Sequence, residues 1–168
     1  MLGLGVSLGR GGAPQVQEPY KEYASDFSSG VDGWEAITDD PPITPTAPTT
    51  LGGVDDALVF PVASDLVFIM RKVGLLSQAG DSNKTMQVTA DVYIESSTSG
   101  GTLQHIAGSF FSNATNLTVS ANAWTTVSFT QELGSLTGST LGFKTVNSTL
   151  LSDGDRIGIK NYVVKFYD

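Results

Sequence analysis

Apolar and polar residues alternate along several short segments of the chain, and this period of two predicts strands that are buried on one face. The clearest cases are residues 86–94 and 123–129. Other runs rich in β-branched and aromatic residues predict strands at 23–27, 34–37, 57–60, 66–70, 103–111, 116–119, 141–146 and 156–167. Because no segment has the period of an amphipathic helix, we predict an all-β, antiparallel sandwich or barrel of about nine or ten strands.

The length of 168 residues fits one domain with an appendage. We assign residues 23–168 to the domain and residues 1–22 to an extended N-terminal arm. Gly and Pro in 9–14 give the arm little propensity for regular structure. Its side chains that could bind a partner are Leu2, Leu4, Val6, Leu8 and Arg10. We expect the arm to dock on a neighbouring subunit or sheet edge, and the alternative is that it folds back on its own domain.

A proline-rich segment interrupts the strands at 39–53. Pro41, Pro42, Pro45 and Pro48 lack a backbone donor and fix φ, so we predict a long loop with no ladder through it. Such a loop contacts a neighbour or is a stiffened excursion over the surface.

Composition excludes several classes of function. The chain has 0 cysteines, which excludes disulfides and thiolate chemistry, and its net charge of −8 opposes binding to nucleic acid or to an anionic membrane. No apolar run reaches the roughly 20 residues that span a bilayer. Residues 1–12 lack the compact apolar core and preceding positive charge of an export signal, so we interpret them as mature structure.

Catalytic groups are sparse. His105 is the single histidine and lies in a predicted strand, where we expect a solvent-facing or hydrogen-bonded side chain. No nucleophile elbow or second imidazole is present. Two adjacent pairs of carboxylates, at 39–40 and 55–56, flank the proline-rich segment and are more typical of turns. We therefore predict no enzyme activity and no catalytic residue.

Four segments in order resemble the jelly-roll carbohydrate-binding modules, which have a galactose-binding-like β-sandwich. They are residues 26–34, which run from an acidic residue and Phe to Gly-Trp, the strand at 86–95, the segment A-W-T-T-V-S-F-T at 123–130 and the segment G-D-R-I-G-I-K-N-Y-V-V-K at 154–165. The resemblance covers residues 26–168 and implies an antiparallel jelly-roll sandwich. Its phrases mark core and turn positions, so it indicates the fold more strongly than sugar binding.

The resemblance also implies a structural calcium, to which Asp26 and Asp168 would contribute. Lys160, however, stands where such modules usually carry an Asp. The loss of a carboxylate and the gain of a positive charge weaken a calcium site. We expect no cofactor and no other metal, and a calcium at Asp26 and Asp168 stays open.

Aromatic side chains are the candidates for stacking on a sugar ring. Trp34 begins a strand and is predicted to lie in the core. Along its predicted strand Trp124 is on the same side as polar residues, and Tyr93 is on the side opposite its apolar neighbours. We therefore predict that both point outward and are available for glycan stacking.

The first twelve residues loosely resemble the start of small virion proteins of tailed phages. Our first hypothesis is a structural virion protein, either a capsid cement or decoration subunit or a fibre or tail accessory. Its partners would be the major capsid protein, another virion protein or further copies of itself. The alternative is a carbohydrate-binding module that recognises cell-surface glycans through exposed aromatics.

Overall fold

A computed structural model describes the protein over residues 17–37, 43–62, 69–96, 101–109, 113–146, 151–152 and 154–168. These residues form eleven strands and one helical turn, which confirms the all-β antiparallel sandwich. The elements are β1 (Lys21–Ser25), β2 (Trp34–Ile37), β3 (Thr46–Leu51), β4 (Val54–Pro61), β5 (Ile69–Val73), α1 (Gln78–Asp81), β6 (Thr85–Ile94), β7 (Gly101–Gly108), β8 (Ala114–Val119), β9 (Thr125–Glu132), β10 (Thr140–Thr145) and β11 (Arg156–Tyr167).

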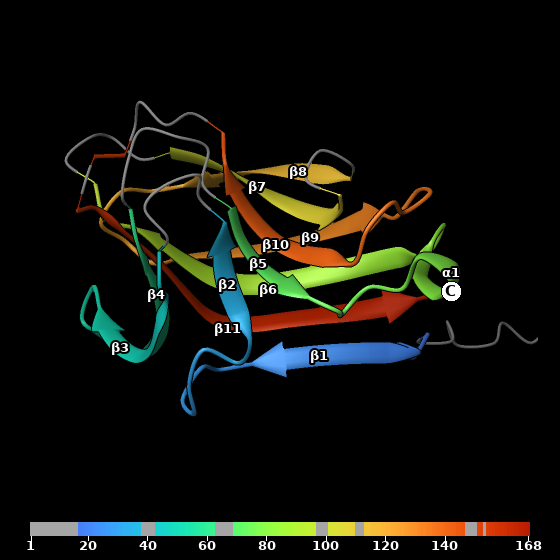
Figure 1. The fold of residues 1–168 in the computed structure, drawn as a ribbon, viewed down its shortest axis with the longest axis horizontal. Coiled ribbons are helices and arrows are strands. Elements are labelled where there is room, and N and C mark those ends of the chain that lie inside the picture. Colours follow the sequence, from blue (N-terminus) through green and yellow to red (C-terminus); the bar gives the residue numbers. More distant parts are fainter. Residues whose placement is uncertain are drawn as a thin grey trace, which may run out of the picture.

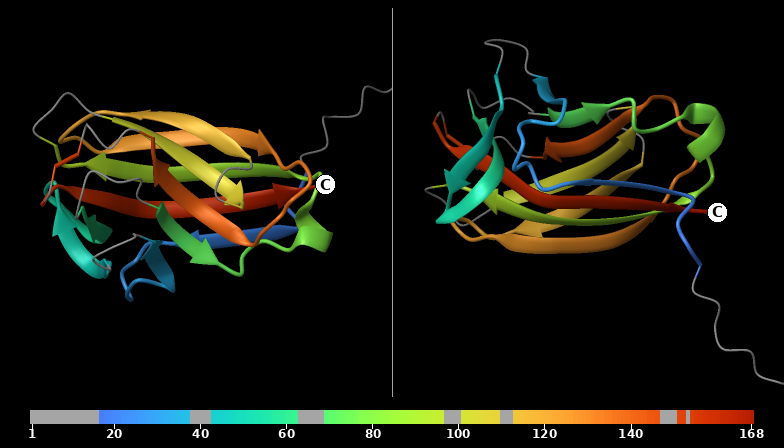
Figure 2. Two further views of the ribbon diagram at one scale, coloured as in Figure 1. Left: turned by 45° about the horizontal axis from the view of Figure 1, so that its top comes forward. Right: turned by 90° about the horizontal axis from the view of Figure 1, so that it is seen from below.

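The strands form two antiparallel sheets that pack face to face (Figure 1). The six-stranded sheet has the order β3-β4-β11-β6-β9, and β1 also pairs with β11. The five-stranded sheet has the order β2-β5-β10-β7-β8. Figure 2 shows the two layers edge-on in its right panel, with the β3–β4 hairpin at one end of the sandwich. Each sheet therefore has one face toward the shared core and one face outward.

The strand β11 organises the six-stranded sheet. Its first part pairs with β4, ending where Ile159 lies opposite Leu58. Its second part pairs with β1, beginning where Tyr162 lies opposite Ser25. Along its other edge it pairs with β6. The strands β1 and β4 therefore lie end to end on the same side of β11.

The core between the sheets follows the alternation seen in the sequence. In β6 every second side chain, from Met86 to Ile94, is buried in this core. An aromatic group fills its centre, where Trp34 is 3% exposed and contacts the rings of Phe143 and Tyr162. The predicted core position of Trp34 is thus confirmed.

His105 lies in the same core and is fully buried. Its Nε2 is 2.9 Å from the hydroxyl of Tyr162, and its ring packs against Phe129 and Phe143. The hydrogen-bonded alternative predicted for this histidine is confirmed, whereas the solvent-facing one is wrong. Burial lowers the pKa of His105 to about 3, with a smaller opposing effect from Gln131.

The predicted loop at 39–53 is wrong over Thr46–Leu51, which forms β3. The reason is that β3 is an edge strand, where a proline removes no hydrogen bond that the sheet needs. Pro48 falls where the pairing with β4 shifts register, between Thr46 and Thr49. Residues 39–42 of this prediction, and 66–68 of the strand predicted at 66–70, lie outside the described residues.

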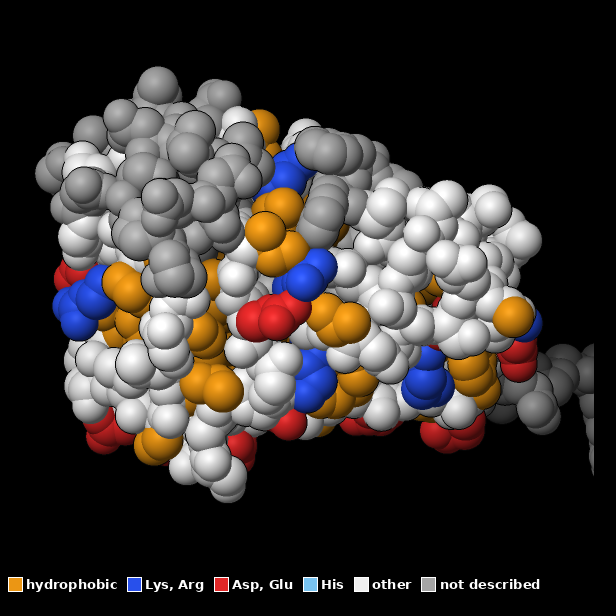
Figure 3. Space-filling model, viewed as in Figure 1, with side chains coloured by type: hydrophobic (Ala, Val, Ile, Leu, Met, Phe, Trp, Pro, Cys, Tyr) orange, Lys and Arg blue, Asp and Glu red, His pale blue; other side chains and the backbone are white. Residues whose placement is uncertain are grey.

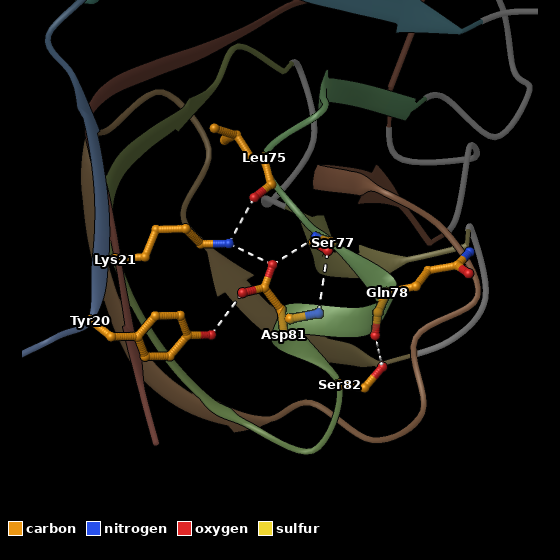
Figure 4. A network of polar contacts seen from close by, with 8 residues as sticks. Tyr20, Lys21, Leu75, Ser77, Gln78, Asp81 and Ser82 are labelled. Carbon is orange, nitrogen blue, oxygen red and sulfur yellow. Dashed lines mark hydrogen bonds and ion pairs between the residues drawn. The ribbon is translucent and has the colours of Figure 1, made fainter.

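A nearly buried carboxylate holds the start of β1 against α1 (Figure 4). Asp81, whose side chain is 3% exposed, accepts hydrogen bonds from the hydroxyl of Tyr20 (2.7 Å), from Lys21 Nζ (2.5 Å) and from the backbone N–H of Ser77 (2.7 Å). Lys21 also donates to the carbonyl of Leu75. These donors offset the cost of burial and hold the pKa of Asp81 below its usual range. The sandwich thus includes Tyr20 and Lys21, whereas the predicted arm extended to residue 22.

In the part of the chain that the structure describes, no helix has the length and apolar character needed to cross a membrane.

Candidate functional site

A small second core lies on the outer face of the six-stranded sheet, away from the main core. Tyr93, Leu51, Ala57 and Val59 form it, and Trp124 packs against it half-buried. The β3–β4 hairpin supplies three of these side chains, so it covers one end of this outer face. Trp124 is the member whose ring remains partly exposed.

The orientation of Trp124 is fixed by several contacts. Its Nε1 donates a hydrogen bond of 3.1 Å to the carbonyl of Leu51. The centroid of its ring lies 5.4 Å from the centroid of the Tyr93 ring. Beneath it is Gly158 of β11, where a Cβ would lie 3.0 Å from the indole and 2.7 Å from Leu51. Gly158 therefore gives the indole room to approach the backbone of β11, and the result is a rigid aromatic surface.

Polar groups on neighbouring strands adjoin the indole. Asp91 of β6 accepts hydrogen bonds from the hydroxyl of Thr126 (2.6 Å) and from the side-chain amide of Asn161 (2.8 Å). Trp124 directly precedes β9, Thr126 lies two residues after it, and both Thr126 and Asn161 are exposed. We call Trp124, Asp91, Thr126 and Asn161 the Trp124 surface. It combines an aromatic ring with a carboxylate, an amide and a hydroxyl.

The hairpin next to this surface carries a shallow groove of about 340 Å³, lined by Pro48, Thr49, Thr50, Asp55 and Asp56. The hydroxyl of Thr50 donates to Asp55 at 2.6 Å. The carboxylate pair at 55–56 thus belongs to an open, hydrogen-bonded hairpin. The turn predicted for this pair is wrong, because both residues lie in β4 and the turn of the hairpin is formed by Gly52 and Gly53. The other pair, at 39–40, lies outside the described residues.

The predicted exposure of Tyr93 is wrong. Tyr93 does point to the outer face of its sheet, as its parity indicates, but it is only 7% exposed. The β3–β4 hairpin covers it, and its ring fills the space over Gly52. Tyr93 therefore supports Trp124 from the side and offers no free face to a sugar.

The outer face of the five-stranded sheet is a second polar surface (Figure 3). Arg71 of β5 donates from Nε to Glu35 of β2 at 2.7 Å, and Gln104 of β7 donates to Asn116 of β8 at 2.9 Å. Figure 3 shows acidic, basic and hydrophobic side chains next to one another on this face. This face offers hydrogen-bonding groups, but none of these four side chains is aromatic.

The two carboxylates suggested for calcium do not meet. Because β1 is antiparallel to β11, Asp26 follows the end of β1 near Asn161, whereas Asp168 lies beyond the other end of β1. A strand rises about 3.3 Å per residue, so the two lie roughly 20 Å apart. Asp168 instead forms an ion pair of 2.5 Å with Lys84. Among the described residues, no three His, Cys, Asp or Glu side chains are grouped closely enough to hold a metal. Asp26 and Asp168 therefore do not share a calcium ion, and the possibility left open for them is contradicted by their separation along β11.

A cleft of about 490 Å³ lies beside Asp26, in the loop between β1 and β2. Asp32, which also lines the cleft, accepts hydrogen bonds from Tyr23 and Lys72.

The five arm residues Leu2, Leu4, Val6, Leu8 and Arg10 lie outside the described residues, so their predicted docking stays a prediction.

No protein-family model matches the chain, and no curated protein does. Solved structures are similar to it. The CBM22-1 xylan-binding domain from Paenibacillus barcinonensis Xyn10C has a TM-score of 0.55 at 10% identity, over 92% of this chain and 99% of that domain. The C-terminal family 22 carbohydrate binding module of Clostridium thermocellum Xyn10B has a TM-score of 0.56 at 16% identity, over 91% and 96%.

Two further structures extend the comparison. The K1 cleaved adhesin domain of Lys-gingipain from Porphyromonas gingivalis has a TM-score of 0.55 at 13% identity, over 86% of this chain and 98% of that domain. In a Clostridium thermocellum xylanase 10B chain that carries CBM22-1 and GH10 modules, the similarity spans 28% of that longer chain. At such identities these structures establish the fold alone, a β-sandwich like that of these carbohydrate-binding modules and of the adhesin domain. They lend no support to the resemblance to phage virion proteins.

Proposed function

We propose that this domain is a non-catalytic glycan-binding module whose sugar contact is centred on Trp124. The observation that carries the proposal is the fixed, partly exposed indole beside the hydrogen-bonded Asp91. The face of an indole is electron-rich and packs favourably against the C–H groups of a pyranose ring. A carboxylate, an amide and a hydroxyl next to it suit the hydroxyl groups at the rim of that ring.

Rigidity of the surface favours binding. Because Leu51, Tyr93 and Gly158 already fix the indole, little side-chain entropy is lost when a sugar stacks on it. Asp91 is likewise held by Thr126 and Asn161, so its oxygens are oriented before a ligand arrives. The fold likeness to modules described as xylan-binding, and to an adhesin domain, supports the same class of ligand.

The test begins with a glycan array and continues with calorimetric titration of the glycan that binds best. Trp124→Ala should weaken that affinity about tenfold or more, which corresponds to about 1.4 kcal/mol. Trp124→Phe keeps an aromatic ring and should lose less. Asp91→Asn should weaken binding with little effect on folding. Circular dichroism and thermal melting of each variant separate lost binding from lost structure.

The matched control is Gln104→Ala on the outer face of the five-stranded sheet. We expect it to bind like the unmodified protein. If it loses binding while a folded Trp124→Ala does not, the sugar contact lies on that other face. A protein that binds no glycan on a broad array would contradict the proposed function itself.

A further inference from the structure

The six-stranded sheet has a junction at which β11 changes its partner. The pairing with β4 ends at Ile159, and the pairing with β1 begins at Tyr162. Lys160 and Asn161 therefore lie where the start of β4 faces the end of β1. The pairing of β11 with β6 also shifts register between Lys160 and Val163. Regular hydrogen bonds between strands thus contribute less to the stability of the sheet at this junction than elsewhere.

Carboxylates flank this junction on both strands. Asp26 follows the end of β1, and Asp55 and Asp56 lie at the start of β4. Because β1 and β4 lie end to end along β11, like charges on their facing ends work against that arrangement. The backbone is irregular as well, with φ of 59° at Asp56 and 51° at Asn161. A positive charge at this place would oppose the repulsion.

Lys160 supplies that charge. Its Nζ donates a hydrogen bond of 2.6 Å to the backbone carbonyl of Asp55, which ties β11 to the start of β4. Hydrogen bonds from Ser28, with a smaller contribution from the charge of Lys160, hold the pKa of Asp26 below its usual range. The ammonium group therefore acts on both strand ends that meet at the junction.

We infer that the ammonium group of Lys160 is a built-in counter-ion that replaces a divalent cation at the β1–β4 junction. The resemblance in sequence implies an Asp at this position and a structural calcium. The residues present do not fit that ion, because an ammonium group repels it and Asp168 lies at the far end of β1. The inference does not depend on glycan binding, and it makes the fold independent of calcium.

The experiment compares thermal melting of the unmodified protein, Lys160→Asp and Lys160→Met in EDTA and in excess calcium chloride. The unmodified protein should melt at the same temperature in both. Both variants should melt lower in EDTA, because the carboxylates lose their counter-ion. Calcium should raise the melting temperature of Lys160→Asp progressively with its concentration, since binding to the folded state stabilises it, and should leave Lys160→Met unchanged.

Lys165→Asp is the matched control, since it places an acid on the same strand next to the exposed Glu22. It should show no response to calcium. If Lys160→Asp is unfolded in EDTA, recovery of its circular dichroism spectrum on calcium addition is the equivalent result. Stabilisation of the unmodified protein by calcium, or indifference of Lys160→Asp to it, would overturn the inference.

Discussion

The hydroxyl oxygen of Tyr162 lies 2.9 Å from Nε2 of His105, and this hydrogen bond joins β11 of one sheet to β7 of the other at the centre of the core. Both side chains are fully buried. The rings are stacked, with centroids 6.1 Å apart and planes inclined by 19°. Burial raises the pKa of Tyr162 and lowers that of His105, so both groups are neutral at ordinary pH. The two sheets are therefore held together partly by a neutral polar pair in an apolar setting.

This pair predicts loss of stability in mild acid. The pKa of His105 is about 3 in the folded protein and 6.5 in an unfolded chain, so the unfolded state binds the extra proton between these values. Stability is complete above pH 6.5 and is lost as the pH falls toward 3, by about 1.4 kcal/mol for each pH unit. Urea unfolding measured from pH 7.5 down to pH 4.5 checks this slope.

The control for this slope is His105→Phe. It leaves the buried hydroxyl of Tyr162 without this partner, which costs about 1–3 kcal/mol, but it carries no group that titrates near pH 6. Asp81, Glu95 and Asp32 have lowered pKa values, so their protonation reduces the free energy of unfolding only at more acidic pH. A slope between pH 6.5 and 5 that is the same in the variant and in the unmodified protein would contradict the prediction.

Gly158→Ala should disturb the Trp124 surface from below. The added methyl group would lie 2.7 Å from Leu51 and 3.0 Å from the indole, so both side chains must move. We expect a loss of about 1–3 kcal/mol in unfolding free energy, the usual cost of overpacking. Near-ultraviolet circular dichroism should report the displaced indole. Gly134→Ala is the control, since its Cβ would meet only an ordinary contact of 3.6 Å with Asn113; equal melting of the two variants would contradict the prediction.

Asp81→Asn should weaken the attachment of β1 to α1. An amide replaces one of the acceptor oxygens for Tyr20, Lys21 and Ser77 with a donor and removes the charge that Lys21 pairs with. We expect a loss of about 2–4 kcal/mol in unfolding free energy, measured by urea titration. The control, Glu22→Gln, breaks an exposed ion pair of 3.7 Å with Lys165 and should cost less than about 0.5 kcal/mol. Similar costs for the two would show that burial of Asp81 has no energetic role.

The local pattern of the sequence predicted several strands and core positions correctly. The strand at 156–167 was predicted with the bounds that the structure gives it, and Trp34 was placed in the core correctly. The first prediction used a run of β-branched and aromatic residues and the second used the position of Trp34 at the start of a strand, and both are local information. The alternation in β6 likewise predicted which residues face the main core.

What the sequence did not predict depends on contacts between distant segments. The parity of Tyr93 gave the correct face of its sheet, but its burial depends on the β3–β4 hairpin, about forty residues away in the chain. That hairpin was missed because Pro48 argues against a strand unless the strand is known to be at an edge. The meeting of Asp26, Asp55 and Lys160 likewise requires the order of strands in the sheet. No local pattern contains that order.

The double pairing of β11 also constrains how the protein can fold during its synthesis. The strand Arg156–Tyr167 pairs with β6, β4 and β1, and its contact between Phe166 and Lys21 joins residues from opposite parts of the chain. Until this strand has left the ribosome, β1 lacks its partner and β4 and β6 each have an open edge. Such long-range pairing slows folding. The β6–β9 and β3–β4 pairs can form early, but the six-stranded sheet must wait for this last strand.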